Sequence, residues 1–200
     1  QNIRKHLFID NEQVVELDYS SLHPAICYAV SGEEMEEGFK PYECDTSFLN
    51  INEKAIENHK IKFGIEKYEP VRSICKQALL CSINAKNIEA AFMAVAHELA
   101  TDLKRPEIKK KYVGIERPFP AKQLCQALCD HNYKIAHFFF SDSGVVLQNL
   151  DSKMADLIIQ DFISDDEVLL PYHDSFIVKK SLEEKLETSN QQTFFSHQEC

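Results

Sequence analysis

The alternation of apolar and polar positions predicts short β-strands near both ends of the chain. Close to the N-terminal end, the segments 7–9 and 13–19 are rich in Leu, Val, Ile and Phe, and each predicts a strand. Residues 168–178 contain an apolar run, the polar triplet His173-Asp174-Ser175 and a second apolar run. This order predicts a tight β-hairpin with polar residues at its tip.

Helical spacing of apolar residues dominates the part of the chain between these strands. The longest such pattern spans 71–103 without Gly or Pro, and a break near 84–87 divides it into two helices. Residues after 188 show no regular pattern, and we expect them to form a tail. Further helices are predicted at 21–30, 53–63, 118–129 and 148–163, and one begins within 181–187.

The composition is that of an ordinary globular protein. Hydrophobic residues make up 44% of the 200 positions and charged residues 27%. A chain of this length favours one domain, with room for an insertion. No apolar run approaches membrane-spanning length, and the first residues lack the pattern of a signal peptide. We therefore expect no membrane association and an intracellular location, either cytoplasmic or nucleoid-associated.

The charge and the cysteines restrict the classes of partner and of metal. A net charge of −10 argues against strong non-specific binding to nucleic acid, which requires clustered Lys and Arg. The one basic cluster lies at 104–111 and includes Lys109 and Lys110. Seven cysteines without a C-x-x-C pair give no zinc-site signal and suit a reducing compartment.

Two acidic residues stand at the ends of predicted strands. Asp18 follows the apolar run 14–17, and Asp174 lies at the tip of the predicted hairpin. Carboxylates that folding brings together are typical of two-metal phosphoryl-transfer sites, since Mg²⁺ prefers hard oxygen ligands. Taken alone, Asp18 equally fits the N-cap of a helix, and the hairpin fits a surface turn with a polar tip.

The first acid lies in a recognisable motif. The stretch 17–33, which begins Leu-Asp-Tyr-Ser and ends Ser-Gly-Glu, resembles motif A of the family A nucleic acid polymerases. The resemblance implies that Asp18 binds both catalytic Mg²⁺ ions and that the backbone carbonyl of Tyr19 binds one. His23 occupies the position of a Glu that excludes a ribose 2′-OH, so it is expected to pack against the nucleotide sugar.

The hairpin resembles motif C of the same superfamily, in which His-Asp lies at the turn. The resemblance implies a catalytic, metal-binding role for Asp174 and a nucleic acid contact for His173. DNA polymerases of the family usually continue with Glu, whereas this chain has Ser175. His-Asp-Ser-Phe is closer to the phage-type single-subunit RNA polymerases.

The helix predicted from residue 71 resembles motif B in its first half. Arg72 and Lys76 have the R-x-x-x-K spacing, which places both cations on one helix face. The resemblance implies that they hold the triphosphate of an incoming nucleotide. Leu80 stands where the family has an aromatic residue, and Asn84-Ala85 replaces its Tyr-Gly pair. Judged alone, the two cations equally fit a solvated helix face.

Two weaker suggestions concern the nucleic acid. Gln148 precedes a predicted helix in the manner of a family glutamine that contacts the minor groove of the primer–template. The basic cluster with Lys109 and Lys110 is a candidate contact for template phosphates, although a solvated loop is the commoner meaning of such a run.

Motifs A, B and C occur in the family order, and together they imply an α+β fold with a polymerase-type palm. In this interpretation an antiparallel sheet with the catalytic hairpin comes from 1–44 and 141–188, and a mainly helical, fingers-like insertion spans 45–140. The tail is 189–200. The implied activity is that of a DNA-directed DNA polymerase in replication or repair. It would act on a DNA primer–template and nucleoside triphosphates with two Mg²⁺ ions, or alternatively Mn²⁺.

Two alternatives stay open from the sequence. One is a single-subunit RNA polymerase or a primase-like enzyme, which Ser175 and His23 favour. The other is a catalytically degenerate palm that serves as a nucleic-acid-binding or structural module. Because only 17 residues precede Asp18, we expect the thumb and any proofreading domain to be absent or to belong to a missing part of a larger chain.

Overall fold

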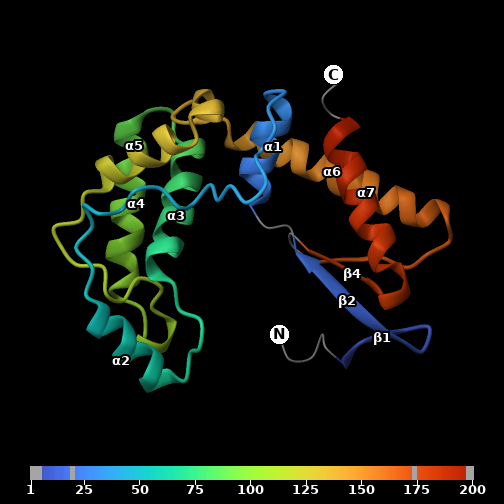
Figure 1. Ribbon diagram of the computed structural model, residues 1–200, viewed down its shortest axis with the longest axis horizontal. Helices are drawn as coiled ribbons and strands as arrows, with labels where there is room; N and C mark the ends of the chain where they lie inside the picture. The colour runs from blue at the N-terminus through green and yellow to red at the C-terminus, as the bar shows by residue number, and fades with distance from the viewer. Residues whose placement is uncertain (1–5, 19–20, 173–174, 197–200) are drawn as a thin grey trace. The chain divides into compact units, whose positions relative to one another are not determined.

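The protein has an α+β fold. The computed structural model describes residues 6–18, 21–172 and 175–196, with side chains described as far as residue 189 (Figure 1). The chain forms two compact units. One, the sheet unit, comprises residues 1–35 and 146–200, and the other, the helical unit, comprises residues 36–145. The expected insertion at 45–140 lies within the helical unit.

The sheet unit is built on four antiparallel strands. In space they follow the order β1-β2-β4-β3, with β3 at an edge. β2 pairs with β4 over five residue pairs, from Val14 opposite Lys179 to Asp18 opposite Ser175. The predicted strands and hairpin are thus present. Their bounds are Phe8–Ile9 for β1, Glu12–Asp18 for β2, Leu170–Tyr172 for β3 and Ser175–Lys179 for β4.

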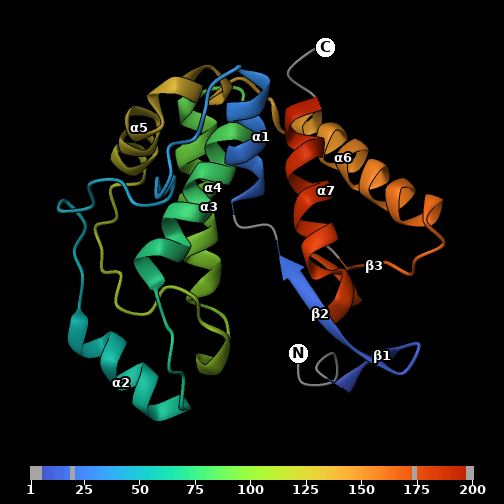
Figure 2. The same cartoon turned by 45° about the vertical axis from the view of Figure 1, so that its right-hand side comes forward.

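Two helices of the sheet unit, α6 and α7, cover one face of the sheet (Figure 2). Because side chains alternate along a strand, β2 directs Val15 and Leu17 into this core and leaves Glu16 and Asp18 on the opposite face. The buried core residues are Ile158, Phe162, Phe176, Val178 and Leu186. The helices of the unit are α1 (Leu22–Val30), α6 (Gly144–Ser164), η4 (Lys180–Leu182) and α7 (Glu183–Ser196). The first two residues of α6 belong to the helical unit.

The helical unit is organised around α3, α4 and α5, which all pack against one another (Figure 1). Their contact surfaces are apolar and fully buried, with Leu79 from α3, Val95 from α4 and Leu124 from α5 at the centre. The elements are α2 (Glu53–Phe63), α3 (Pro70–Asn84), α4 (Ile88–Asp102), η2 (Glu107–Lys109), α5 (Ala121–His131) and η3 (Tyr133–Phe138).

The predicted break within the long helical pattern is confirmed at 85–87. Ala85 adopts an extended conformation and ends α3. Asn87 starts α4, since its side chain accepts a hydrogen bond from the backbone N–H of Ala90 at 2.8 Å. An asparagine at this position satisfies one of the free N–H groups of the first helical turn.

Two expected boundaries differ from the structure. α6 begins at Gly144 rather than at 148. The expected tail at 189–200 is wrong in its first part, because α7 continues to Ser196. Its continuation is supported by tertiary contact, since Ser189 is buried and its hydroxyl donates a hydrogen bond to the Asp161 carboxylate of α6. Among the helices of the described residues, none is long and apolar enough to cross a membrane.

A buried carboxylate holds the end of α4 against the segment that follows it. Asp102 is 3% exposed and accepts hydrogen bonds from the backbone N–H groups of Lys111 and Tyr112, at 2.9 and 3.0 Å. The Arg105 guanidinium pairs with the same carboxylate at 3.0 Å and with Glu98 at 3.0 Å. One acid therefore closes the turn between α4 and residue 112.

We predict that Asp102→Ala lowers the free energy of unfolding by about 3 kcal/mol, because the backbone N–H groups of Lys111 and the buried Tyr112 lose a charged acceptor. Glu98→Ala, which removes the other partner of Arg105 and leaves the N–H groups satisfied, should cost less than half as much. Urea denaturation followed by circular dichroism measures both. Equal losses for the two variants would contradict a clamping role for Asp102.

Candidate active site

The strand register brings the end of β2 and the end of the predicted hairpin to the same end of the sheet. Asp18, the last residue of β2, lies opposite Ser175, the first residue of β4. Ser175 also pairs with Tyr172, the last residue of β3. His173 and Asp174 connect these two strands in sequence and, like Tyr19, lie outside the described residues. The predicted partner strands are therefore neighbours, with Asp18 across from the residue that follows Asp174.

Ser175 links the two motif segments through its side chain. It is only 4% exposed, and its hydroxyl is within hydrogen-bonding distance of a Glu16 carboxylate oxygen (2.8 Å) and of the Tyr172 carbonyl (2.9 Å). The hydroxyl can donate to either acceptor. A buried serine thus joins β2 to the end of the hairpin, at the residue that follows Asp174 in sequence.

Glu16 is a feature of this region that sequence reasoning missed. It precedes Asp18 by two residues and so shares the sheet face that points away from α6 and α7. The sequence does contain a signal for this arrangement, because residues two apart on a strand direct their side chains to the same face. Asp18 itself is exposed, which leaves its carboxylate oxygens accessible from solvent.

Asp18 is the one proposed metal-binding carboxylate among the residues that the structure describes. Within the part of the chain that the structure describes, no three His, Cys, Asp or Glu side chains form a metal-binding group. Mg²⁺ does not require such a group, because it usually takes one or two protein carboxylates together with phosphates and water. An exposed carboxylate at the end of a paired strand is compatible with that mode of binding.

In the helical unit, Arg72 and Lys76 lie one turn apart on α3, and both are exposed. The Arg72 guanidinium lies over the ring of Tyr42, 5.6 Å from its centroid. Arg72 also lines a cavity of about 580 Å³ beside the start of α3, together with Lys60 from α2 and Tyr68. The expected arrangement of two cations on one helix face is present.

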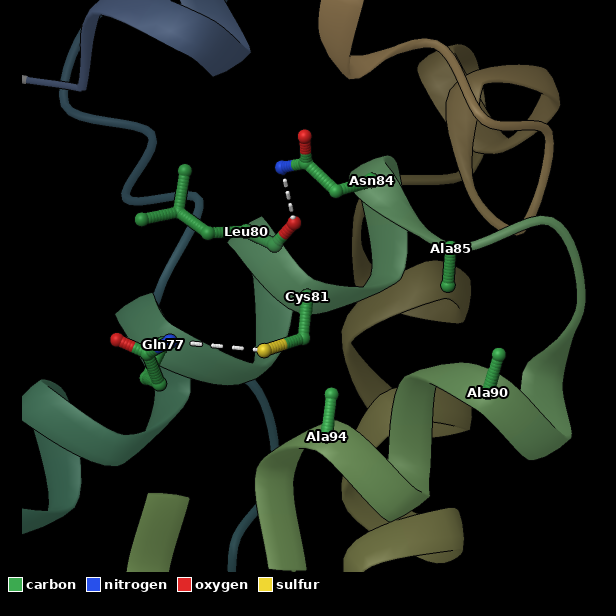
Figure 3. Close-up of a pocket in the computed structure, with 7 residues that line it drawn as sticks. All are labelled: Gln77, Leu80, Cys81, Asn84, Ala85, Ala90 and Ala94. Carbon is green, nitrogen blue, oxygen red and sulfur yellow. Dashed lines mark hydrogen bonds between the residues drawn. The ribbon is translucent and has the colours of Figure 1, made fainter. Parts of the chain in front are cut away.

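Leu80 lies on α3 at the edge of a second cavity, of about 310 Å³ (Figure 3). This cavity opens between α3 and α4 because Ala90 and Ala94, four residues apart on α4, are small. Asn84 donates its side-chain N–H to the Leu80 carbonyl at 2.7 Å. Leu80 therefore presents an aliphatic side chain here, and the amide of Asn84 is bonded to its own helix.

The remaining candidate residues are distributed over both units. His23 is partly buried near the start of α1. Gln148 is exposed but lies inside α6, so the expectation that it precedes a helix is wrong. In the basic cluster, Lys109 is exposed, whereas Lys110 forms an ion pair with Glu107 at 3.0 Å. Acidic neighbours thus neutralise part of that cluster.

We predict that Ser175→Ala lowers the free energy of unfolding by about 1–2 kcal/mol, because it removes the hydroxyl that bonds β2 to the hairpin. Ser152→Ala on the exposed side of α6 is the matched control. It should change stability by less than about 0.5 kcal/mol. Thermal and urea denaturation measure both values, and a neutral Ser175→Ala variant would contradict the assigned contact.

Comparisons with known proteins add no relative from which a function could be transferred. A scan against models of protein families found no match for this chain. Searches among curated proteins and among solved structures likewise returned no similar protein. A functional argument for this chain therefore depends on its own residues and their geometry.

Proposed function

We propose that this chain is a template-directed nucleotidyltransferase with DNA polymerase activity, organised as a polymerase-type palm with a fingers-like helical insertion. The observation that supports it most strongly is the pairing of β2 with β4, which sets Asp18 opposite Ser175. Motif A and motif C are far apart in sequence, and a two-metal reaction requires their acids to act together.

In this proposal Asp18 and Asp174 are the catalytic acids, and the Tyr19 carbonyl is an additional metal ligand. Bound Mg²⁺ would activate the attacking 3′-hydroxyl and stabilise the departing pyrophosphate. The protein contributes rigid placement, because Asp18 sits at the end of a strand whose neighbouring residues are hydrogen-bonded to β4. Positioning and electrostatic stabilisation account for most of the catalysis in phosphoryl transfer.

Arg72 and Lys76 are proposed to bind the triphosphate of the incoming nucleotide. Two exposed cations one helix turn apart match the spread of charge along a polyphosphate chain. The contact of Arg72 with the Tyr42 ring does not prevent this role, since a cation–π contact at an exposed site contributes only about 0.5–1 kcal/mol. A phosphate can therefore compete for the guanidinium.

The other candidate residues receive supporting roles in the same proposal. His23 is assigned to the nucleotide sugar and Leu80 to an apolar contact with the nucleotide. The exposed Gln148 and Lys109 are accessible for contact with a DNA primer–template. The remaining nucleic acid contacts of the proposal are His173 and Lys110.

A transcribing or primase-like polymerase is the second candidate, and one observation favours it. The residue opposite Asp18 is a buried serine whose hydroxyl is bonded to Glu16, whereas the DNA polymerases that the hairpin resembles usually have an acid at that position. Parallel assays with deoxyribonucleotides and ribonucleotides separate the two candidates. Incorporation of ribonucleotides without a primer would establish the second.

We predict that Asp18→Asn and Asp174→Asn each reduce primer extension in the presence of Mg²⁺ by about 10³-fold. Loss of one metal-binding carboxylate removes several kcal/mol of transition-state stabilisation. Extension of a labelled primer by the purified chain measures the rate.

Asp166→Asn is the matched control for this experiment, since it removes the same charge from an exposed turn with a positive φ that Asn tolerates. Its rate should equal that of the unchanged chain. Full activity of Asp174→Asn would exclude the proposed site. A folded chain without Mg²⁺ binding or nucleotide incorporation would instead identify a degenerate palm with a binding or structural role.

We predict that Arg72→Ala and Lys76→Ala each raise the KM for the nucleoside triphosphate by about 10-fold or more, because each removes a charged phosphate contact. Lys54→Ala, on the exposed surface of α2, is the control and should leave KM unchanged. Steady-state incorporation at varied nucleotide concentration provides the measurement. Equal KM values for all three variants would remove Arg72 and Lys76 from the nucleotide site.

A further inference from the structure

Two cysteine thiols of the helical unit are in direct contact. Cys44, in the segment before α2, and Cys75, on α3, are hydrogen-bonded to each other through their side chains. Cys44 is partly exposed, whereas Cys75 is 1% exposed. Both line the cavity of about 580 Å³ that Arg72 also lines. A small solute can therefore reach this pair through the cavity.

The contact makes the two thiols chemically unequal. The hydrogen bond from Cys75 lowers the pKa of Cys44 and outweighs the opposing effects of burial and of the Asp45 charge. The same bond, together with burial, raises the pKa of Cys75. Cys44 is also the more exposed of the two residues, so a solute that enters the cavity meets it first.

The other cysteines that the structure describes have a different environment. Burial is the main cause that raises the pKa of each of these thiols, so they stay protonated near neutral pH. They are Cys27, Cys81, Cys125 and Cys129. A partly exposed thiol that has a lowered pKa and lies beside a second thiol is the arrangement expected of an oxidation-sensitive cysteine.

We propose that Cys44 and Cys75 form a peroxide-reactive pair, in which Cys44 is the nucleophile and Cys75 closes an intrachain disulfide. The pair would be a modification site independent of the proposed polymerase function. Three observations support this assignment. The two side chains are in contact, both line the cavity, and Cys44 is more exposed than Cys75.

The chemistry balances with hydrogen peroxide as the oxidant. The Cys44 thiolate attacks one peroxide oxygen, the O–O bond breaks, and the departing hydroxide takes a proton to become water. Cys44 is then a sulfenic acid. The sulfur of Cys75 next attacks the sulfur of Cys44, the S–O bond breaks, and hydroxide leaves with the Cys75 proton as a second water. Two thiols are oxidised and one peroxide is reduced.

The disulfide would have a local structural effect. It would tie the segment before α2 to α3 one helical turn after Arg72. Tyr42, whose ring lies under the Arg72 guanidinium, is two residues from Cys44. Oxidation would therefore fix the segment that carries this aromatic partner against the helix that carries the guanidinium.

Peptide mass spectrometry tests the proposal. The reduced 200-residue chain is treated with hydrogen peroxide, its remaining thiols are alkylated, and it is digested. We expect a peptide pair linked through Cys44 and Cys75, lighter by two hydrogen atoms than the two reduced peptides. Alkylation of Cys44 to the same extent with and without peroxide would overturn the proposal, as would oxidation spread equally over Cys81 and Cys129.

Serine variants separate the roles of the two sulfurs. Cys44→Ser should abolish peroxide-dependent loss of thiols, whereas Cys129→Ser, at another partly exposed cysteine, should leave the linked pair intact. Cys75→Ser should stop the reaction at a sulfenic acid on Cys44 that a sulfenic-acid-specific reagent captures. Circular dichroism checks the folding of each variant. If the buried Cys75→Ser variant does not fold, the partly exposed Cys44→Ser variant decides, and unchanged oxidation in it excludes the pair.

Discussion

The antiparallel pairing of β2 with β4 is the constraint on which the candidate site depends. Val15 and Leu17 must face the core formed with α6 and α7, and a shift of one residue would turn them to the opposite face. Burial of that apolar face therefore fixes the register, and the register sets Asp18 opposite Ser175. Packing on one face of the sheet thus determines which polar residues meet on the other.

Elements with local signals could be predicted from the sequence, whereas those that depend on distant contacts could not. α2 has the expected bounds because Asn52 caps its start and Gly64 ends it with a positive φ. The start of α6 at Gly144 could not be predicted, because it depends on a distant contact. Gly144 packs so tightly against the Asn84 side chain that a Cβ would collide with it. The continuation of α7 similarly depends on the burial of Ser189.

The same distinction applies to the candidate site. Asp18 and Asp174 could be identified as candidates from the local pattern, because each follows an apolar run in the sequence. The link from Ser175 to Glu16 was not, since it requires the register of two strands from opposite ends of the chain. The neutralisation of the basic cluster was also hidden. Glu98, two helical turns before Arg105, forms an ion pair with it. A count of the charges within 104–111 does not include this acid.

The sequence separation between β2 and β4 also has a consequence for the order of folding. The whole helical unit is inserted between these strands, so their pairing closes a very long loop, and closure entropy rises with loop length. The contacts among α3, α4 and α5 are much more local, and local contacts form faster. Prior folding of residues 36–145 replaces a flexible loop with a compact body and makes closure easier. We therefore expect the sheet end that carries Asp18 to be completed late, after the inserted helices have formed.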